Sequence, residues 1–360
     1  MKPRTSWIWP VGLMLLVVSL GCEHKRSPDE KERREKAVIA EIERLGGFVN
    51  VLLRGRKVSL EHSRITDAGL EQLKDLDNVV WLRLPAQITD TGLKHLEGLL
   101  NLWDLSLDKT QITDGGLAHL KAIPNLSYLS LDNTRITDAG LEHLERLTEL
   151  EGLTISNTQV TDARLEHLKK LDKLLSLDIA STQVTDAGLR HLRGVPNLRS
   201  LSLDKTQITG AGLEHLIGLP RLERLSIERT QITDAGLAHL KAIPNLRYLS
   251  LAHTQITDAG LGHLKGLTGL KGLNIERTQI TDAGLAHLKA IPNLQDLLLF
   301  WIQISDTGIG HLKGLPKLRY LRIHSELKMQ VTPEAIKEYR EKLEQALPDC
   351  HIFYYGPIGS

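Results

Sequence analysis

Ten histidines recur at a constant spacing, and they are the residues of this chain that most resemble a set of metal ligands. A metal ion needs three or four donor atoms at about 2 Å, with further hydrogen bonds behind them. This spacing instead puts one histidine on each of a series of short helices whose axes lie about 8–10 Å apart. No carboxylate or cysteine repeats beside them, so we expect packing or hydrogen bonding along the seam between helices, and no metal site. The ten are His95, His119, His143, His167, His191, His215, His239, His263, His287 and His311.

A row of threonines with the same spacing could supply nucleophiles. No general base stands beside them at a fixed offset, and their hydroxyls are able to bond backbone groups in a turn. Motifs of serine hydrolases, phosphate loops, zinc peptidases and calcium hands are missing. The sequence therefore predicts a chain that is not an enzyme and has no catalytic residues and no cofactor. The threonines are Thr110, Thr134, Thr158, Thr182, Thr206, Thr230, Thr254 and Thr278.

Both rows belong to a repeat of 24 residues, which signals stacked supersecondary units. Its most regular part is Thr-Asp-Ala-Gly, with Asp at 67, 90, 114, 138, 162, 186, 234, 258, 282 and 306, and with Gly210 in the one gap. Segments 126–155 and 246–275 also match closely at an offset of 120 residues. The array is therefore predicted to have grown by copying blocks of five units.

One unit, Leu246 to Gly269, shows how each repeat should fold. Its first half contains Leu-x-Leu, the alternation of a half-buried strand. Its second half offers Thr257 as a helix N-cap and Asp258 in the first turn, where the helix dipole favours an anion. We expect Gly260 to let this short helix pack closely on the strand layer.

The different spacings of strands and helices predict a bent array. Parallel strands stack about 4.8 Å apart, whereas helices prefer about 8–10 Å. The expected fold is an α/β right-handed solenoid shaped like a horseshoe, with a parallel sheet on the concave face and short α-helices on the convex face.

Over residues 58–332 the sequence resembles the leucine-rich-repeat family, with about 11–12 units. The ITDAGLxHL run is most similar to the cysteine-containing subtype of F-box adaptors and their bacterial relatives. Thr replaces the usual Cys or Asn of the turn, and the period is 24 rather than 26. No F-box-like segment precedes the repeats, which argues against a ubiquitin-ligase role. The resemblance implies a module that holds another macromolecule rather than a catalyst.

The two ends of the array read as caps. Residues 37–57 should form a helix, with Val38, Ile42 and Leu45 on one face, and then an edge strand from Phe48. Residues 333–360 should form a longer helix, a strand and a tail, because a solenoid must close its last open face.

The first 36 residues are expected to export and tether the chain. Lys2 and Arg4 precede an apolar stretch ending at Leu20, and Gly21-Cys22 resembles a lipoprotein signal with Cys22 as the lipidated residue. A plain cleaved signal over 1–22 and a short anchor are the alternatives. Residues 23–36 are charged and suit a solvated tether, or their second half is the start of the next helix. With Cys22 acylated, Cys350 has no partner for a disulfide.

One unit departs from the others and is the predicted binding site. Leu298, Phe300 and Trp301 stand where the other repeats have mostly polar residues, and exposed aromatics on a concave face often anchor proteins. The competing interpretation is that Phe353-Tyr354-Tyr355 or residues 324–330 fold over them. Polar positions beside the strands are either a solvated rim or a docking surface. The remaining residues of the predicted site are Tyr248, Glu276, Arg277, Tyr320 and Arg322.

Composition limits the partner without identifying it. Lys and Arg number 45 against 44 Asp and Glu, so no strong field attracts nucleic acid or an anionic membrane. We expect a monomeric recognition module in the periplasm or on the cell surface, bound to the membrane through its lipid only, with a protein or glycan as partner. The alternatives are a structural envelope protein and an intracellular adaptor.

Overall fold

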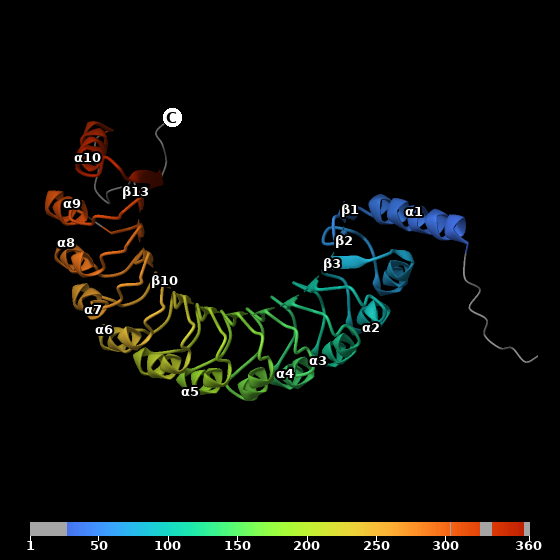
Figure 1. The fold of residues 1–360 in the computed structure, drawn as a ribbon. Coiled ribbons are helices and arrows are strands. Elements are labelled where there is room, and N and C mark those ends of the chain that lie inside the picture. The colour runs from blue at the N-terminus through green and yellow to red at the C-terminus, as the bar shows by residue number, and fades with distance from the viewer. Residues whose placement is uncertain (1–26, 303, 325–332, 356–360) are drawn as a thin grey trace, which may run out of the picture.

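The computed structural model describes residues 27–302, 304–324 and 333–355, which form one curved array (Figure 1). Within them, fourteen strands make a single sheet in which the strand order follows the sequence. The first two strands form an antiparallel hairpin, and every later neighbour pairs in parallel. The strands are β1 Phe48–Leu52, β2 Gly55–Ser59, β3 Val79–Arg83, β4 Asp104–Ser106, β5 Tyr128–Ser130, β6 Gly152–Thr154, β7 Ser176–Asp178, β8 Ser200–Ser202, β9 Arg224–Ser226, β10 Tyr248–Ser250, β11 Gly272–Asn274, β12 Asp296–Leu299, β13 Tyr320–His324 and β14 His351–Tyr355.

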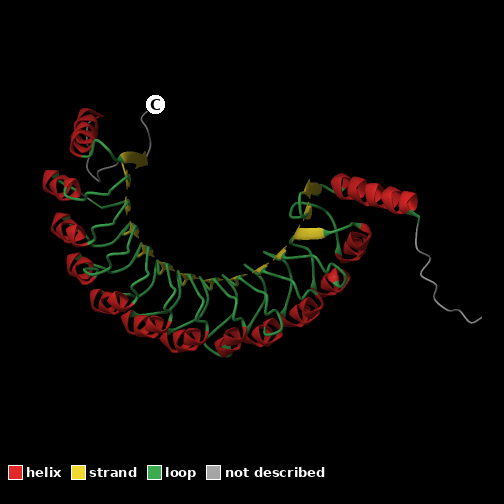
Figure 2. Cartoon of the chain, viewed as in Figure 1, coloured by secondary structure: helices red, strands yellow, loops and turns green. Residues whose placement is uncertain are grey.

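Helices cover the outer side of the sheet, and the strands line the inner side (Figure 2). Most units have one α-helical turn followed by, or replaced by, a 3-10 helix. A 3-10 helix rises about 2.0 Å per residue against 1.5 Å, so a short repeat covers the same distance with fewer residues. The α-helices are α1 Pro28–Arg44, α2 Asp90–Leu93, α3 Asp114–Leu117, α4 Asp138–Leu144, α5 Asp186–Leu189, α6 Asp234–Leu237, α7 Asp258–His263, α8 Asp282–Leu285, α9 Asp306–Lys313 and α10 Pro333–Ala346. The 3-10 helices span Asp67–Asp75, Lys94–Leu96, Ala118–Ala122, Leu165–Lys170, Arg190–Gly194, Gly210–Gly218, Ala238–Ala242 and Ala286–Ala290.

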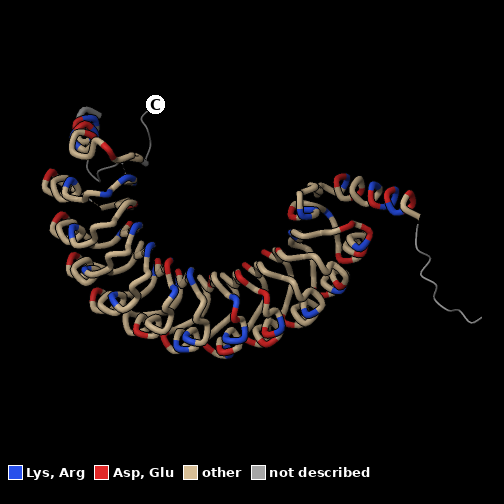
Figure 3. Tube along the Cα trace, viewed as in Figure 1, with Lys and Arg blue, Asp and Glu red and all other residues tan. Residues whose placement is uncertain are grey.

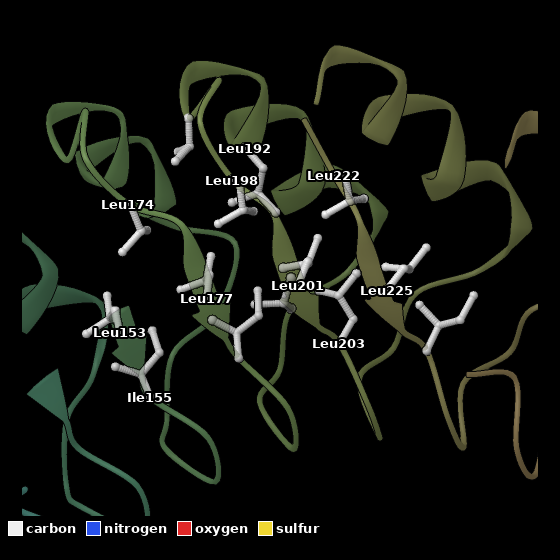
Figure 4. Packing of buried hydrophobic residues seen from close by; sticks show 14 of the residues in the cluster. Leu153, Ile155, Leu174, Leu177, Leu192, Leu198, Leu201, Leu203, Leu222 and Leu225 are labelled. Atoms are coloured by element: carbon white, nitrogen blue, oxygen red, sulfur yellow. The ribbon is translucent and has the colours of Figure 1, made fainter. Parts of the chain in front are cut away.

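A continuous leucine core fills the space between strands and helices (Figure 4). The middle residue of each strand lies opposite its counterpart in the next repeat, as Leu249 does with Leu273 and Leu273 with Leu297. All three are buried. The expected fold class, an α/β horseshoe with a parallel concave sheet, is confirmed.

A second set of contacts, which we name the Asp–Thr ladder, joins neighbouring repeats. The Asp that begins each helix accepts two hydrogen bonds from the N-cap residue of the following repeat. For the threonine N-caps, the backbone N–H lies 2.7–2.9 Å from Oδ1, and the hydroxyl lies 2.5–2.7 Å from Oδ2. Asp282 bonds Ser305 in the same way. Asp258 lies in the first turn of α7, as expected, and it also bonds Thr281 of the next repeat.

The ladder also explains the glycine of each helix, and our expectation for Gly260 was wrong in its cause. A Cβ on Gly260 would meet Oδ1 of Asp234, from the preceding repeat, and would lie 2.6 Å from Cγ2 of Ile256. The side chain is excluded by the ladder and by an isoleucine of the same repeat, not by the strand layer. At the one gap Gly210 replaces Asp, and a Cβ there would lie 2.9 Å from Cα of Gly236.

The N-terminal helix is longer than expected. Helix α1 begins at Pro28, with Ser27 as N-cap, so the charged residues from 28 onward are helical rather than a tether. Their charges form pairs four residues apart, Glu30 with Arg34 and Glu32 with Lys36, a spacing that supports a helix. Its buried residues Val38 and Ile42 join the core.

At the other end α10 and β14 follow the last repeat. Leu343 and Leu347 of this segment join the buried core. Lys342 reaches Asp306, the last aspartate of the repeat series, with Nζ 3.0 Å from Oδ2. An ion pair thus stands where the next repeat would supply a threonine.

Candidate functional site

Each three-residue strand from β4 to β11 presents its first and third residues to the concave face and buries the residue between them, as alternation requires. In β10 these are Tyr248 and Ser250, with Leu249 buried. Because the repeats are in register, the concave face carries two parallel rows of side chains. The choice of residue in these rows decides what the surface can hold.

A hollow of about 430 Å³ crosses this face in the C-terminal half of the array. At its centre the ring of Tyr248 lies over Gly272 of the next strand, where a Cβ would come within 2.6 Å of Cδ1. The Arg224 guanidinium stands over the same ring at 4.0 Å. The lining residues that face the concave side are Ser200, Ser202, Arg224, Ser226, Tyr248, Ser250, Gly272, Asn274, Asp296, Leu298 and Arg322.

The predicted site residues do not form one patch. Tyr248, Leu298 and Arg322 line the hollow. Phe300 and Trp301 follow β12 and lie past the strand, where Phe300 is half-buried and Trp301 is 38% exposed. Trp301 adopts a φ of 62° in a turn, which turns its side chain away from the strand rows.

Glu276 and Arg277 stand beside that turn rather than in the hollow. The Arg277 guanidinium lies 4.5 Å from the Trp301 ring centre, a cation–π contact. The Arg277 side chain reaches its neighbour Glu276 only at 4.0 Å. These residues form a second surface along the edge of the hollow.

The C-terminal tail extends the sheet instead of folding over the odd repeat. Strand β14 pairs with β13 on the side away from β12, so the backbone of residues 353–355 is separated from β12 by a strand. Tyr320 stacks on Phe353, with ring centres 6.5 Å apart, and Arg322 stands 5.6 Å from the Phe353 ring. Phe353 is 42% exposed. The other proposed cover, residues 324–330, lies outside the described residues from 325 onward.

A second hollow, of about 470 Å³, lies in the N-terminal half and was missed by sequence reasoning. Its tyrosine, Tyr128, also lies over a glycine of the next strand, Gly152. Trp103 packs edge-on against Tyr128, with centres 5.6 Å apart, and Glu151 accepts from the Tyr128 hydroxyl at 3.3 Å. The signal was present in the copied blocks, because Tyr128 and Gly152 precede Tyr248 and Gly272 by 120 residues.

Half-buried carboxylates follow β4 and β5, the strands of the repeats that line this second hollow. Asp108 accepts hydrogen bonds from Ser106 at 2.9 Å and from the Asp132 backbone N–H at 3.1 Å. Burial raises the pKa of Asp132 to about 6, aided by the negative charge of Asp108 and partly offset by hydrogen bonds from Ser156. The ionised form of Asp132 is therefore disfavoured at this place on the surface.

The repeated histidines and threonines have structural contacts. Each threonine hydroxyl donates to the carbonyl three residues earlier, at 2.5–2.7 Å, which confirms the predicted turn role. Some histidines bond across the helix seam, such as His119 with Glu97 at 3.2 Å and His167 with Glu145 at 2.6 Å. These contacts agree with the predicted hydrogen bonding along the seam, and the carboxylates do not recur at every histidine. In the described part of the chain no three His, Cys, Asp or Glu side chains gather into a metal cluster.

The N-terminal predictions concern residues that are not described. Cys22, the expected lipidation site, and the signal at 1–22 lie outside the described residues. Among the helices that are described, none has the length and apolar character needed to cross a membrane.

Comparison with known proteins identifies the family. The sequence matches the model of a leucine-rich repeat region over residues 70–350. No curated protein matches it.

Solved structures share the fold. An internalin (inlF) from Listeria monocytogenes has a TM-score of 0.53 and 22% identity, over 82% of this chain and 94% of that one. An internalin C2 from the same organism has a TM-score of 0.45 and 30% identity, over 57% of this chain and 83% of its own. A plant peptide hormone receptor in complex with RGF2 has a TM-score of 0.47 and 14% identity, over 85% of this chain and 51% of its own. Because the family model spans most of the sequence and the repeats stack as described, this chain belongs to the leucine-rich repeat family.

Proposed function

We propose that this chain is a non-catalytic recognition protein that holds a protein partner in the hollow around Tyr248. The observation that carries the proposal is the lining of that hollow. The Tyr248 ring lies between the Arg224 guanidinium and the buried backbone of Gly272, and serine side chains line the same hollow. Such a mixture of one apolar anchor and several hydrogen-bonding groups is typical of protein-binding surfaces.

The polar groups of the hollow support binding rather than catalysis. Ser226 donates to Asp204 at 2.6 Å, and Ser250 donates to Glu228 at 2.5 Å. Within the described residues no histidine completes either pair, so neither serine has the base that nucleophilic attack requires. These hydroxyls instead hold the carboxylates against the sheet.

Site-specific photo-crosslinking in the cells that make the full chain tests this proposal. A photoreactive amino acid at Ser250 should form an adduct with a protein partner. The same photoreactive amino acid should form no adduct at Ser130, the equivalent position 120 residues earlier. It should also form none at Glu142, on an outer helix. Adding Tyr248→Ala to the Ser250 variant should remove the adduct while circular dichroism stays unchanged. Equal adducts at all three positions, or none, would contradict the proposal.

We also propose that the chain is exported and anchored through Cys22. The supporting features are the basic start, the apolar stretch and the Gly21-Cys22 pair. Labelled palmitate should be incorporated by the full chain and by a Cys350→Ala variant, and not by Cys22→Ala. Labelling that survives Cys22→Ala would contradict lipidation at this residue.

A further inference from the structure

A row of turn residues runs along the edge of the concave face. In each repeat from β4 to β12 one residue after the strand takes a left-handed φ between 49° and 62°. We name these nine residues the turn row: Lys109, Asn133, Asn157, Ser181, Lys205, Arg229, His253, Arg277 and Trp301. Hydrogen bonds between repeats fix their backbone, since Lys205 N–H donates to the Glu228 carbonyl at 2.8 Å and Arg229 N–H to that of Ala252 at 2.9 Å. The row therefore presents one side chain about every 4.8 Å.

The composition of the turn row changes midway. The three residues before β8 are Asn133, Asn157 and Ser181, which are neutral. The four after β8 through β11 are Lys205, Arg229, His253 and Arg277, and all but His253 are exposed. Trp301 ends this basic part of the row. Figure 3 shows Lys and Arg gathered at the inner rim of the C-terminal half.

Two cations of this part have no close acidic partner among the described residues. No carboxylate there lies within 4.0 Å of the charged atoms of Lys205 or Arg229, whereas Arg277 reaches Glu276 at that limit. The adjacent Asp204 accepts from the Ser226 hydroxyl at 2.6 Å and from the Glu228 backbone N–H at 2.7 Å. Lys205 and Arg229 therefore leave positive charge available to a bound group.

His253 lies between two arginines of the row. The Arg229 guanidinium donates a hydrogen bond to Nε2 of His253 at 3.2 Å. Burial, followed by the charges of Arg229 and Arg277, lowers the pKa of His253 and favours its neutral form. The positive charges of both arginines therefore act at one place in the row and would attract a negative group bound there.

We propose that Lys205, Arg229, His253 and Arg277 bind an acidic, extended segment of the protein partner, and that Trp301 takes an apolar residue at its end. This inference rests on the proposed function and adds the chemistry of the partner. Alternate side chains of an extended peptide lie about 6.8 Å apart, within reach of long cations spaced at 4.8 Å. A sugar-phosphate or polyphosphate chain suits the row less, because Asp204 and Glu228 lie beside it and would repel a dense line of charge.

The test uses the full chain and a dye-labelled peptide of about a dozen residues, alternating Glu and Ser and ending in two leucines. Fluorescence anisotropy should show binding that weakens with salt, because the contacts are charged. Lys205→Asn combined with Arg229→Asn should weaken it at least about tenfold, a loss of about 1.4 kcal/mol. Asn occupies the same turn in two earlier repeats, so the double variant should fold. Lys109→Asn, in the isolated cation of the same row, should leave binding unchanged.

Three outcomes would overturn this inference. The first is no binding of the acidic peptide, and the second is an equal loss in Lys109→Asn. The third is tighter binding of heparin or polyphosphate than of the peptide, abolished by the double variant, which would assign the row to a different polyanion. A crosslinked partner at Ser250 together with any of these results would leave the proposed function standing and remove only the role of the row. The His253 imidazole signal should shift on peptide binding, which localises the contact.

Discussion

At the scale of single residues, the aspartates of the Asp–Thr ladder hold one repeat to the next. Each carboxylate satisfies a backbone N–H and a hydroxyl of the following repeat, and both would otherwise lack a partner there. Hydrogen bonds to charged groups contribute more than neutral ones, about 1.5–3 kcal/mol each. Part of that value is lost to solvent, since these groups are only partly buried.

Asp186→Ala should therefore destabilise the protein by about 1–3 kcal/mol, because Thr209 loses both of its contacts with Asp186. Urea denaturation would measure the free energy of unfolding. Asp306→Ala is the matched control, because the contact that Asp306 makes within the described residues is the ion pair with Lys342, and its side chain is 74% exposed. Exposed ion pairs contribute about 0–1 kcal/mol. Equal effects of the two substitutions would contradict a role for the ladder.

The ionisation of Asp132 should lower the stability of the folded protein as pH rises, which is the opposite of what most carboxylates do. Its folded pKa of about 6 lies above the ordinary value of 3.8, so the ionised form disfavours folding. That penalty is full above pH 6 and disappears as pH falls below 3.8. Asp132→Asn, whose amide oxygen still accepts from the Ser156 N–H, should raise Tm by a few degrees at pH 7.5 and leave it unchanged at pH 3.5. A rise of the same size at both pH values would refute this origin.

At the scale of the element, the neighbouring repeat decides which positions of an outer helix can carry a side chain. Two glycines of α7 differ in this respect. A Cβ on Gly260 would meet Asp234, whereas a Cβ on Gly262 would lie 3.8 Å from the nearest atom, in the His287 ring. Asp234 therefore leaves no room for a side chain at position 260, whereas position 262 has room for one.

We expect Gly260→Ala to cost about 1–3 kcal/mol, as overpacking does, and to break the hydrogen bonds between Asp234 and Thr257. Gly262→Ala should be neutral or stabilise by up to about 1 kcal/mol, since alanine favours the helix. Thermal unfolding of both variants provides the comparison. If Gly260→Ala did not lower the melting temperature, the hydrogen bonds of the Asp–Thr ladder could be rearranged at little cost in stability.

The same elements show what sequence reasoning could and could not supply. The 24-residue period predicted the strands and helices, because each depends on residues within one repeat, and the general spacings of strands and helices then predicted the curvature. The ladder was not predicted, because Asp258 contacts a residue 23 positions away, and only the rotation between repeats brings the two together. Phe300 and Trp301 were grouped with Leu298 because the turn that separates them depends on a left-handed φ at Trp301, which is unusual for a bulky residue.

At the scale of the whole molecule, the array behaves as a chain of junctions between neighbours. Most junctions have a leucine core, a sheet ladder and an Asp–Thr pair. The junction at Gly210 lacks the pair, and the backbones of Gly210 and Gly236 approach closely instead. The array therefore contains one junction of a different kind near its middle.

Hydrogen exchange should reveal that junction. The N–H groups of Thr209 and Thr257 donate to Asp186 and Asp234, whereas among the described residues no carboxylate accepts from Thr233, which is exposed. We expect the Thr233 amide to exchange at least about tenfold faster than the other two, as measured by NMR. Equal protection would mean that the glycine contact shields this turn as well as an aspartate does.

The Asp–Thr ladder also bears on how such a gene can change its length. Most repeats carry an aspartate for the unit after them and a threonine with a glycine for the unit before them, so the two faces of such a repeat are complementary halves of one joint. A block of whole repeats keeps one half of the joint at each end. Unequal recombination that inserts or deletes five units therefore leaves both new junctions chemically complete. The match between segments 126–155 and 246–275, identical at 20 of 30 positions, is the trace such an event would leave in the sequence.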